Sequence, residues 1–134
     1  MSRRATSTFR VRYGETDQMG VAYHPNYLVW CEIGRTDFMR ELGAPYAEME
    51  RQGFYLAVAE ASVRYGAAAY YDDVIRVVTA LDSVRSRSVR FAYEIERIEP
   101  DPTPLARATT TLVSMDGEGR SRALPPDVLD LFRT

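Results

Sequence analysis

The segment NYLVWCEIGRTDFMREL, residues 26–42, decides the fold. Its apolar residues recur at intervals of three and four, which is the spacing of one face of an α-helix. Asn26 is predicted to cap this helix and Gly43 to end it. Because the apolar arc is wide, we expect the helix to be mostly buried rather than to lie on a surface. The arc comprises Tyr27, Leu28, Trp30, Cys31, Ile33, Phe38, Met39 and Leu42.

Two residues of this helix have a more specific interpretation. Gly34 at mid-helix costs about 1 kcal/mol relative to alanine, so we expect it to allow the close approach of a strand or a ligand. Cys31 falls on the apolar arc and is interpreted as a core residue.

The segments around the helix are mostly predicted strands. Residues 6–13 alternate apolar and basic side chains, as a strand with one solvated face does. Residues 14–25 contain two glycines and a proline and are predicted to be a loop. A short helix is expected over 45–52, strands over 54–65, 73–82, 87–98 and 105–115, and a short helix after the proline pair at 125–126.

This order of elements predicts an α+β fold. One strand and a long buried helix precede four long strands with no helix between them, which indicates an antiparallel sheet of five to six strands wrapped around the helix. An open sheet with exposed edges would promote aggregation, so we expect strand-edge pairing in a dimer.

Length and composition limit the possible functions. A chain of 134 residues favours one domain, 1–134, and a net charge of −2 does not suggest a nucleic-acid binder. One cysteine cannot form an internal disulfide, and one cysteine with one histidine makes a metal site unexpected. No segment has the length of a signal peptide or a membrane span, so we expect a complete cytoplasmic protein without membrane insertion.

The candidate chemistry lies in YGETDQMGVAYHPNYLVW, residues 13–30. Asp17 precedes the helix, and a carboxylate there can simply stabilise the helix dipole. However, the loop is rich in aromatic residues, and backbone amides near Gly20 and His24 lie close to the predicted helix start, where they can stabilise negative charge. A carboxylate facing such amides fits acyl transfer, as nucleophile or general base. Glu15 is interpreted as a solvated loop residue, and His24 as structural or catalytic.

A second candidate is the segment VRSRSVR, residues 84–90. In a regular strand, Arg85 and Arg87 would lie on one side and Ser86 and Ser88 on the other. The segment is either a solvated strand start or a phosphate clamp of guanidinium and hydroxyl groups. No GxSxG motif indicates a serine hydrolase, and no glycine-rich loop indicates a nucleotide cofactor, so no cofactor is expected.

Residues 12–28, RYGETDQMGVAYHPNYL, resemble the opening of the hot-dog-fold acyl-CoA thioesterases. The resemblance is closest to the 4-hydroxybenzoyl-CoA thioesterase group and to the short-chain acyl-CoA thioesterases of the Tol–Pal operon. The spacing Asp-x-x-Gly-x-x-Tyr-His-x-Asn-Tyr carries it, and it continues at Tyr71-Asp72-Asp73-Val74, at Arg85–Ser88 and at the proline-led C-terminal helix.

The resemblance implies a hot-dog fold and assigns roles to particular residues. Asp17 would be the catalytic carboxylate, the backbone N–H near His24 would polarise the thioester carbonyl, and the His24 side chain would orient Asp17 or the substrate. Arg85, Ser86, Arg87 and Ser88 would bind the CoA phosphates. The acyl pocket would be lined by Tyr23, Tyr27, Tyr46, Phe54, Tyr55 and Leu56. Subunits would pair into dimers with active sites at the interface, and dimers into tetramers.

The function expected from the resemblance is hydrolysis of a small aromatic or short-chain acyl-CoA by Asp17. A hot-dog dehydratase is a weaker hypothesis, because here the acidic residue precedes the lone histidine by seven positions, as in the thioesterases. A non-catalytic protein that binds acyl-CoA or acyl-carrier protein is the alternative, although the presence of Asp17 argues against it.

Overall fold

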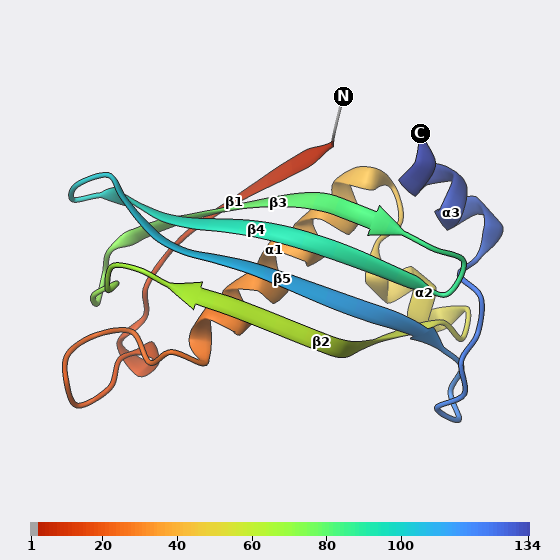
Figure 1. Cartoon of the computed structure of the whole chain (residues 1–134), viewed down its shortest axis with the longest axis horizontal. Coiled ribbons are helices and arrows are strands. Elements are labelled where there is room, and N and C mark those ends of the chain that lie inside the picture. Colours follow the sequence, from red (N-terminus) through yellow and green to blue (C-terminus); the bar gives the residue numbers. More distant parts are fainter. Residues whose placement is uncertain (1–2) are drawn as a thin grey trace.

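The computed structural model describes residues 3–134 and consists of one antiparallel sheet with helices on one side (Figure 1). The five strands lie in the order β1-β3-β4-β5-β2, and every neighbouring pair is antiparallel. The elements are β1 (Arg4–Arg10), a 3₁₀ turn (Tyr13–Glu15), α1 (Asn26–Leu42), α2 (Tyr46–Arg51), β2 (Tyr55–Tyr65), β3 (Val74–Val84), β4 (Ser88–Glu99), β5 (Thr103–Met115) and α3 (Pro126–Arg133). The α+β architecture is as predicted.

Helix α1 lies across one face of the sheet and forms the core with it (Figure 1). Alternate residues of β3 and β4 are buried, as expected for strands with one face toward a core. The largest fully buried side chains include Trp30 of α1, Ile75 of β3 and Phe91 of β4. The alternation seen in the sequence therefore reports the face that packs on α1.

The glycine at the middle of α1 allows a strand to approach closely. A Cβ atom at Gly34 would overlap Thr79 Oγ1 of β3 and would lie 3.0 Å from Val77 Cγ1. The expectation of a close approach is confirmed, and the neighbour is a strand.

The ends of α1 agree with the sequence in part. Gly43 ends the helix in the left-handed conformation, with φ of 97°, as predicted. Asn26 is not the N-cap: Pro25 occupies that position, and Asn26 is the first helical residue. The Asn26 side chain instead donates a hydrogen bond from Nδ2 to the Glu15 backbone oxygen, at 2.9 Å.

One face of α1 is not buried, which contradicts the prediction for Leu28 and Ile33. These side chains are 38% and 37% exposed, and the neighbouring Val29 is 44% exposed. The reason is the position of α1 across the sheet. The helix packs mainly on β1 and β3 and leaves β2 largely uncovered. Among the described residues, strand β2 is an edge strand bonded only to β5, and its Val58 is 50% exposed. No helix within residues 3–134 has both the length and the apolar character needed to cross a membrane.

Candidate active site

The predicted loop before α1 is folded as a small hairpin with Asp17 at its tip. The Tyr23 N–H donates to the Glu15 backbone oxygen at 2.8 Å, and the Asp17 N–H donates to the Val21 oxygen at 2.9 Å. The Gly20 N–H closes the turn on the Asp17 oxygen at 3.0 Å. Gly20 has a φ of 84°, a conformation that favours glycine. Gly20 therefore shapes the turn, and its amide is already used within the hairpin.

The Asp17 carboxylate is half-buried and only partly engaged. Its Oδ1 accepts the Met19 N–H at 2.9 Å, which fixes the side chain in an Asx turn. Its Oδ2 has no hydrogen-bond or ion-pair partner among residues 3–134. One oxygen thus orients the group while the other can attack a carbonyl carbon or accept a proton from water.

Glu15 is buried, so its interpretation as a solvated loop residue was wrong. Its side chain is held by three donors: the Arg12 backbone N–H to Oε1 at 2.8 Å, the Trp30 indole N–H to Oε2 at 3.0 Å, and the Arg12 guanidinium to Oε2 at 3.5 Å. Trp30 is fully buried on α1, so this contact ties the base of the hairpin to the helix. Two features made Glu15 hard to interpret from the sequence: its polar type, and a partner fifteen residues away.

The His24 side chain lies beside aromatic rings rather than beside Asp17. The imidazole is exposed, with ring centroids 5.0 Å from Tyr23 and 6.1 Å from Tyr65. Within the described part of the chain it makes no hydrogen bond or ion pair, and in particular none with Asp17.

The His24 backbone N–H is an available donor at the start of α1. The next amides along the chain are used, since Asn26, Tyr27 and Leu28 each donate to a carbonyl three residues earlier, at 2.9–3.2 Å. Within residues 3–134 the His24 N–H has no acceptor. Of the amides expected near Gly20 and His24, the structure therefore leaves that of His24 able to stabilise an oxyanion.

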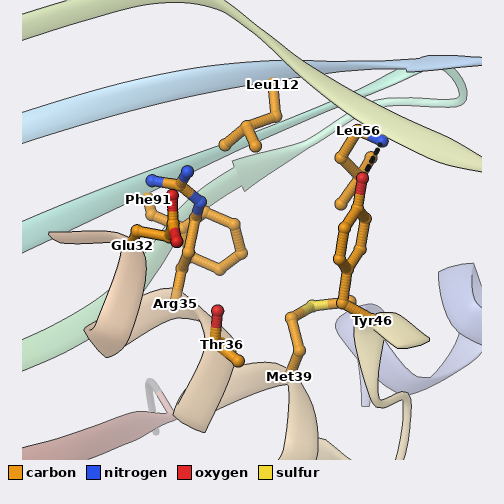
Figure 2. Close-up of a pocket in the computed structure, with 8 residues that line it drawn as sticks. All are labelled: Glu32, Arg35, Thr36, Met39, Tyr46, Leu56, Phe91 and Leu112. Atoms are coloured by element: carbon orange, nitrogen blue, oxygen red, sulfur yellow. Dashed lines mark hydrogen bonds between the residues drawn. The ribbon is translucent and has the colours of Figure 1, made fainter. Parts of the chain in front are cut away.

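A cavity of about 270 Å³ lies between α1 and the sheet (Figure 2). Of the predicted acyl-pocket residues, Tyr46 and Leu56 line it, and the Tyr46 hydroxyl accepts the Leu56 N–H at 3.0 Å. The other lining residues were not predicted from the sequence; they are Glu32, Arg35, Thr36, Met39, Phe91 and Leu112. Helical spacing of 32, 35, 36 and 39 was the available indication that these four share a face.

The remaining predicted pocket residues lie outside this cavity. Tyr23 and Tyr27 are at the hairpin end of α1. There the Tyr27 ring packs on Trp30, with 4.6 Å between the ring centroids. Phe54 lies under the Arg122 guanidinium, 3.8 Å from its ring centroid. Tyr55 is 37% exposed at the start of β2.

Residues 85–87 form a turn between β3 and β4 rather than a regular strand, and Ser88 is the first residue of β4. The Arg85 N–H donates to the Ser88 oxygen at 2.8 Å, and the Arg87 guanidinium reaches Ser121 Oγ at 3.3 Å. Figure 1 places this turn and the Asp17 hairpin at opposite ends of the long axis. Within one chain, the structure does not bring the two predicted site segments together.

Neither a cysteine nucleophile nor a metal centre is indicated by the described residues. Burial raises the pKa of the Cys31 thiol to about 12, so the thiolate is scarce near neutral pH and the residue is poorly suited to nucleophilic attack. Within residues 3–134, no three His, Cys, Asp or Glu side chains gather in a way that could hold a metal ion.

Comparison with known proteins agrees with this geometry. The sequence model of the thioesterase-like superfamily matches residues 11–132. The acyl-CoA thioester hydrolase YbgC of Escherichia coli O157:H7 is 30% identical, over 92% of this chain and 92% of that protein. The crystal structure of the DHNA-CoA thioesterase of Staphylococcus aureus has a TM-score of 0.91 and 28% identity, covering 97% of this chain and 89% of that one.

A second solved structure connects the chain to the group indicated by residues 12–28. The 4-hydroxybenzoyl-CoA thioesterase of Pseudomonas sp. strain CBS-3 has a TM-score of 0.84 and 26% identity, covering 96% of this chain and 99% of that one. The hot-dog fold implied by the sequence resemblance is confirmed by these neighbours. The chain therefore belongs to the thioesterase-like superfamily of thioester hydrolases.

Proposed function

We propose that this protein hydrolyses the thioester of a small aromatic or short-chain acyl-CoA, with the Asp17 carboxylate as the reacting group. The observation that carries the proposal is the hairpin itself. It presents the Asp17 Oδ2 and ends at the His24 N–H beside the start of α1, and neither group has a partner within residues 3–134. The substrates in the names of the similar proteins, an acyl-CoA thioester and 4-hydroxybenzoyl-CoA, support the choice of carrier.

In the proposed reaction the His24 N–H stabilises the oxygen of the thioester as it gains negative charge. Asp17 acts in one of two ways. As general base it takes a proton from water, whose oxygen bonds to the acyl carbon. As nucleophile it forms a mixed anhydride that water then cleaves. In both routes the C–S bond breaks, the sulfur leaves as CoA thiolate and takes up a proton, and the acyl group leaves as a carboxylic acid.

We propose that the site is completed by a second copy of the chain paired along β2. The support is a set of exposed apolar residues, which are Leu28, Val29 and Ile33 of α1 and Val58 of the edge strand β2. Two-fold antiparallel pairing would place the Tyr55 end of one β2 beside the Tyr65 end of the other. Phe54, Tyr55 and Leu56 would then reach the hairpin of the second copy, which accounts for their position far from Asp17 in their own chain.

We also propose that Arg85, Ser86, Arg87 and Ser88 bind CoA phosphates at the site of another copy, in a tetramer of paired dimers. The exposed guanidinium groups of Arg85 and Arg87 suit phosphate oxygens. Their distance from the hairpin along the long axis supports a role in a neighbouring site (Figure 1). The cavity beside Tyr46 and Leu56, about 270 Å³, is our candidate for the acyl end.

The test is release of free thiol from a panel of aromatic and aliphatic acyl-CoAs by the wild type and by Asp17→Asn. The asparagine side-chain oxygen can still accept the Met19 N–H, so the turn is retained while the basic oxygen is lost. We expect kcat to fall at least about 100-fold, the lower range for loss of general acid–base catalysis.

The matched control is Asp116→Asn, which makes the same change in another Asx turn. Asp116 Oδ1 accepts the backbone N–H of Glu118 at 2.8 Å and that of Arg120 at 3.0 Å, in the turn after β5. Wild-type kcat is expected there. Full activity of Asp17→Asn would refute the role of Asp17, and binding of every acyl-CoA without thiol release would favour the non-catalytic alternative.

A further inference from the structure

Tyr65, the last residue of β2, is hydrogen-bonded to the backbone of the proposed site. Its hydroxyl donates to the His24 carbonyl oxygen at 2.9 Å. Its ring packs edge-on against Tyr27 at 5.0 Å between centroids, and close to the His24 imidazole at 6.1 Å. Tyr65 is 45% exposed, so it lies at the surface, with its ring against the buried Tyr27.

The Tyr65 hydroxyl acts on a backbone segment that is already held at its other end. Upstream of His24, the Tyr23 N–H is bonded to the oxygen of the buried Glu15. Downstream, the His24 carbonyl accepts the Tyr65 hydroxyl and the Tyr27 N–H, and Pro25 has a ring-restricted φ. The His24 N–H lies between these two fixed points and is itself unpartnered within residues 3–134.

We infer that Tyr65 is a positioning residue, whose hydroxyl holds the His24 carbonyl so that the neighbouring His24 N–H stays aimed at the thioester oxygen. The inference rests on the proposed function, because it needs an oxyanion at that N–H. A donor stabilises a transition state most when it is oriented beforehand and need not reorganise during the reaction. Loss of the hydroxyl would leave the His24 carbonyl held by the Tyr27 N–H alone. The looser His24–Pro25 peptide would let the His24 backbone turn at its Cα, which would weaken the aim of the N–H without removing it.

The experiment is Tyr65→Phe, which deletes one oxygen and keeps the ring against Tyr27 and His24. We expect kcat to fall about 5- to 50-fold, less than for outright loss of an oxyanion donor. KM is expected to stay within about twofold and the pH–rate profile to keep its shape, because the inferred role involves neither substrate binding nor proton transfer. The matched control is Tyr71→Phe, since Tyr71 is also exposed and its hydroxyl has no hydrogen-bond partner in the described chain.

Each outcome decides the inference. A lower kcat at constant KM, with the oligomeric state unchanged on a sizing column, supports it. An unchanged kcat, a rise in KM alone, a shifted alkaline limb of the pH profile, or dissociation into monomers would overturn it. If the wild type releases no thiol from any acyl-CoA, the proposed function fails; if the wild type is active and Tyr65→Phe matches it, this inference alone fails.

Discussion

The two edge strands of the sheet, β1 and β2, differ in how far the rest of the chain covers them. At the β1 edge, Ala5 and Ser7 are buried, and α1 packs over them. The Ser7 hydroxyl donates a hydrogen bond to Asp37 Oδ2 of α1 at 2.6 Å. The Phe9 ring packs on Trp30, with 5.7 Å between the ring centroids. At the β2 edge, Val58 is exposed and no element of residues 3–134 pairs with the outer side of the strand.

This difference explains where the proposed active site lies. The same helix closes one edge and leaves the other open, because it is displaced toward β1 and β3. The Asp17 hairpin is joined to the open edge through Tyr65 and His24. A second copy that pairs with β2 would therefore be in a position to complete the site, whereas the β1 edge serves stability within one chain.

The largest effect is expected from a charge placed on the open edge, with Val58→Asp. Val58 and Leu56 are two residues apart on β2, so both side chains point toward the α1 side of the sheet, before the irregularity in the strand at Val58/Glu60. A carboxylate without a partner in an apolar interface costs several kcal/mol. The proposed dimer is therefore expected to dissociate, and thiol release to be lost with it. Analytical ultracentrifugation and the thiol assay measure the two effects.

The matched control for this charge is Thr6→Asp on the closed edge. Thr6 is exposed on β1, so the added carboxylate stays in water. We expect an unchanged oligomeric state and unchanged kcat. Equal dissociation by both variants, or an active dimeric Val58→Asp, would contradict the assignment of β2 as the pairing edge.

A smaller effect, on stability alone, is expected on the closed side from Gly34→Ala. The new Cβ would overlap Thr79 Oγ1, so α1 and β3 must separate slightly. Overpacking of this kind typically costs about 1–3 kcal/mol, against a gain of about 1 kcal/mol in helix propensity. A net loss of up to about 2 kcal/mol is therefore expected. Urea unfolding measures the loss.

Thr79→Ala provides the internal check on this prediction. It removes the overlapping atom, which is also a buried hydroxyl with no hydrogen-bond partner in the described residues. The double variant is expected to recover most of the stability lost by Gly34→Ala. Additive losses in the double variant would show that the contact with Thr79 is not the cause.

The parts of the fold that the sequence could predict are those set by local patterns. The helix was predicted with its observed end at Leu42 and with its start one residue too late, because its spacing and Gly43 act within a few residues. The strands of the sheet followed from alternation. Asn26 was assigned to the wrong position because its side chain bonds to Glu15, eleven residues away, rather than to the helix amides.

The parts that could not be predicted depend on contacts between distant segments. Glu15 is buried because the Trp30 indole reaches it, and no sequence spacing indicates that contact. The exposure of Leu28 and Ile33 depends on where α1 lies across the sheet, which periodicity does not report. The motif spacing selected Asp17 and His24, but the structure was needed to distinguish the His24 amide from the Gly20 amide, which is bonded within the hairpin.

The smallest effect is expected from Ser7→Ala at the closed edge. The substitution removes the hydrogen bond to Asp37, whose carboxylate keeps the Arg40 guanidinium at 2.9 Å and stays partly hydrated. A loss of about 1 kcal/mol in the free energy of unfolding is therefore expected, with kcat and the oligomeric state unchanged. Unfolding curves measure the change in stability, and the thiol assay on the same preparation measures kcat. A fall in kcat at full stability would mean that the β1 edge also contributes to the site.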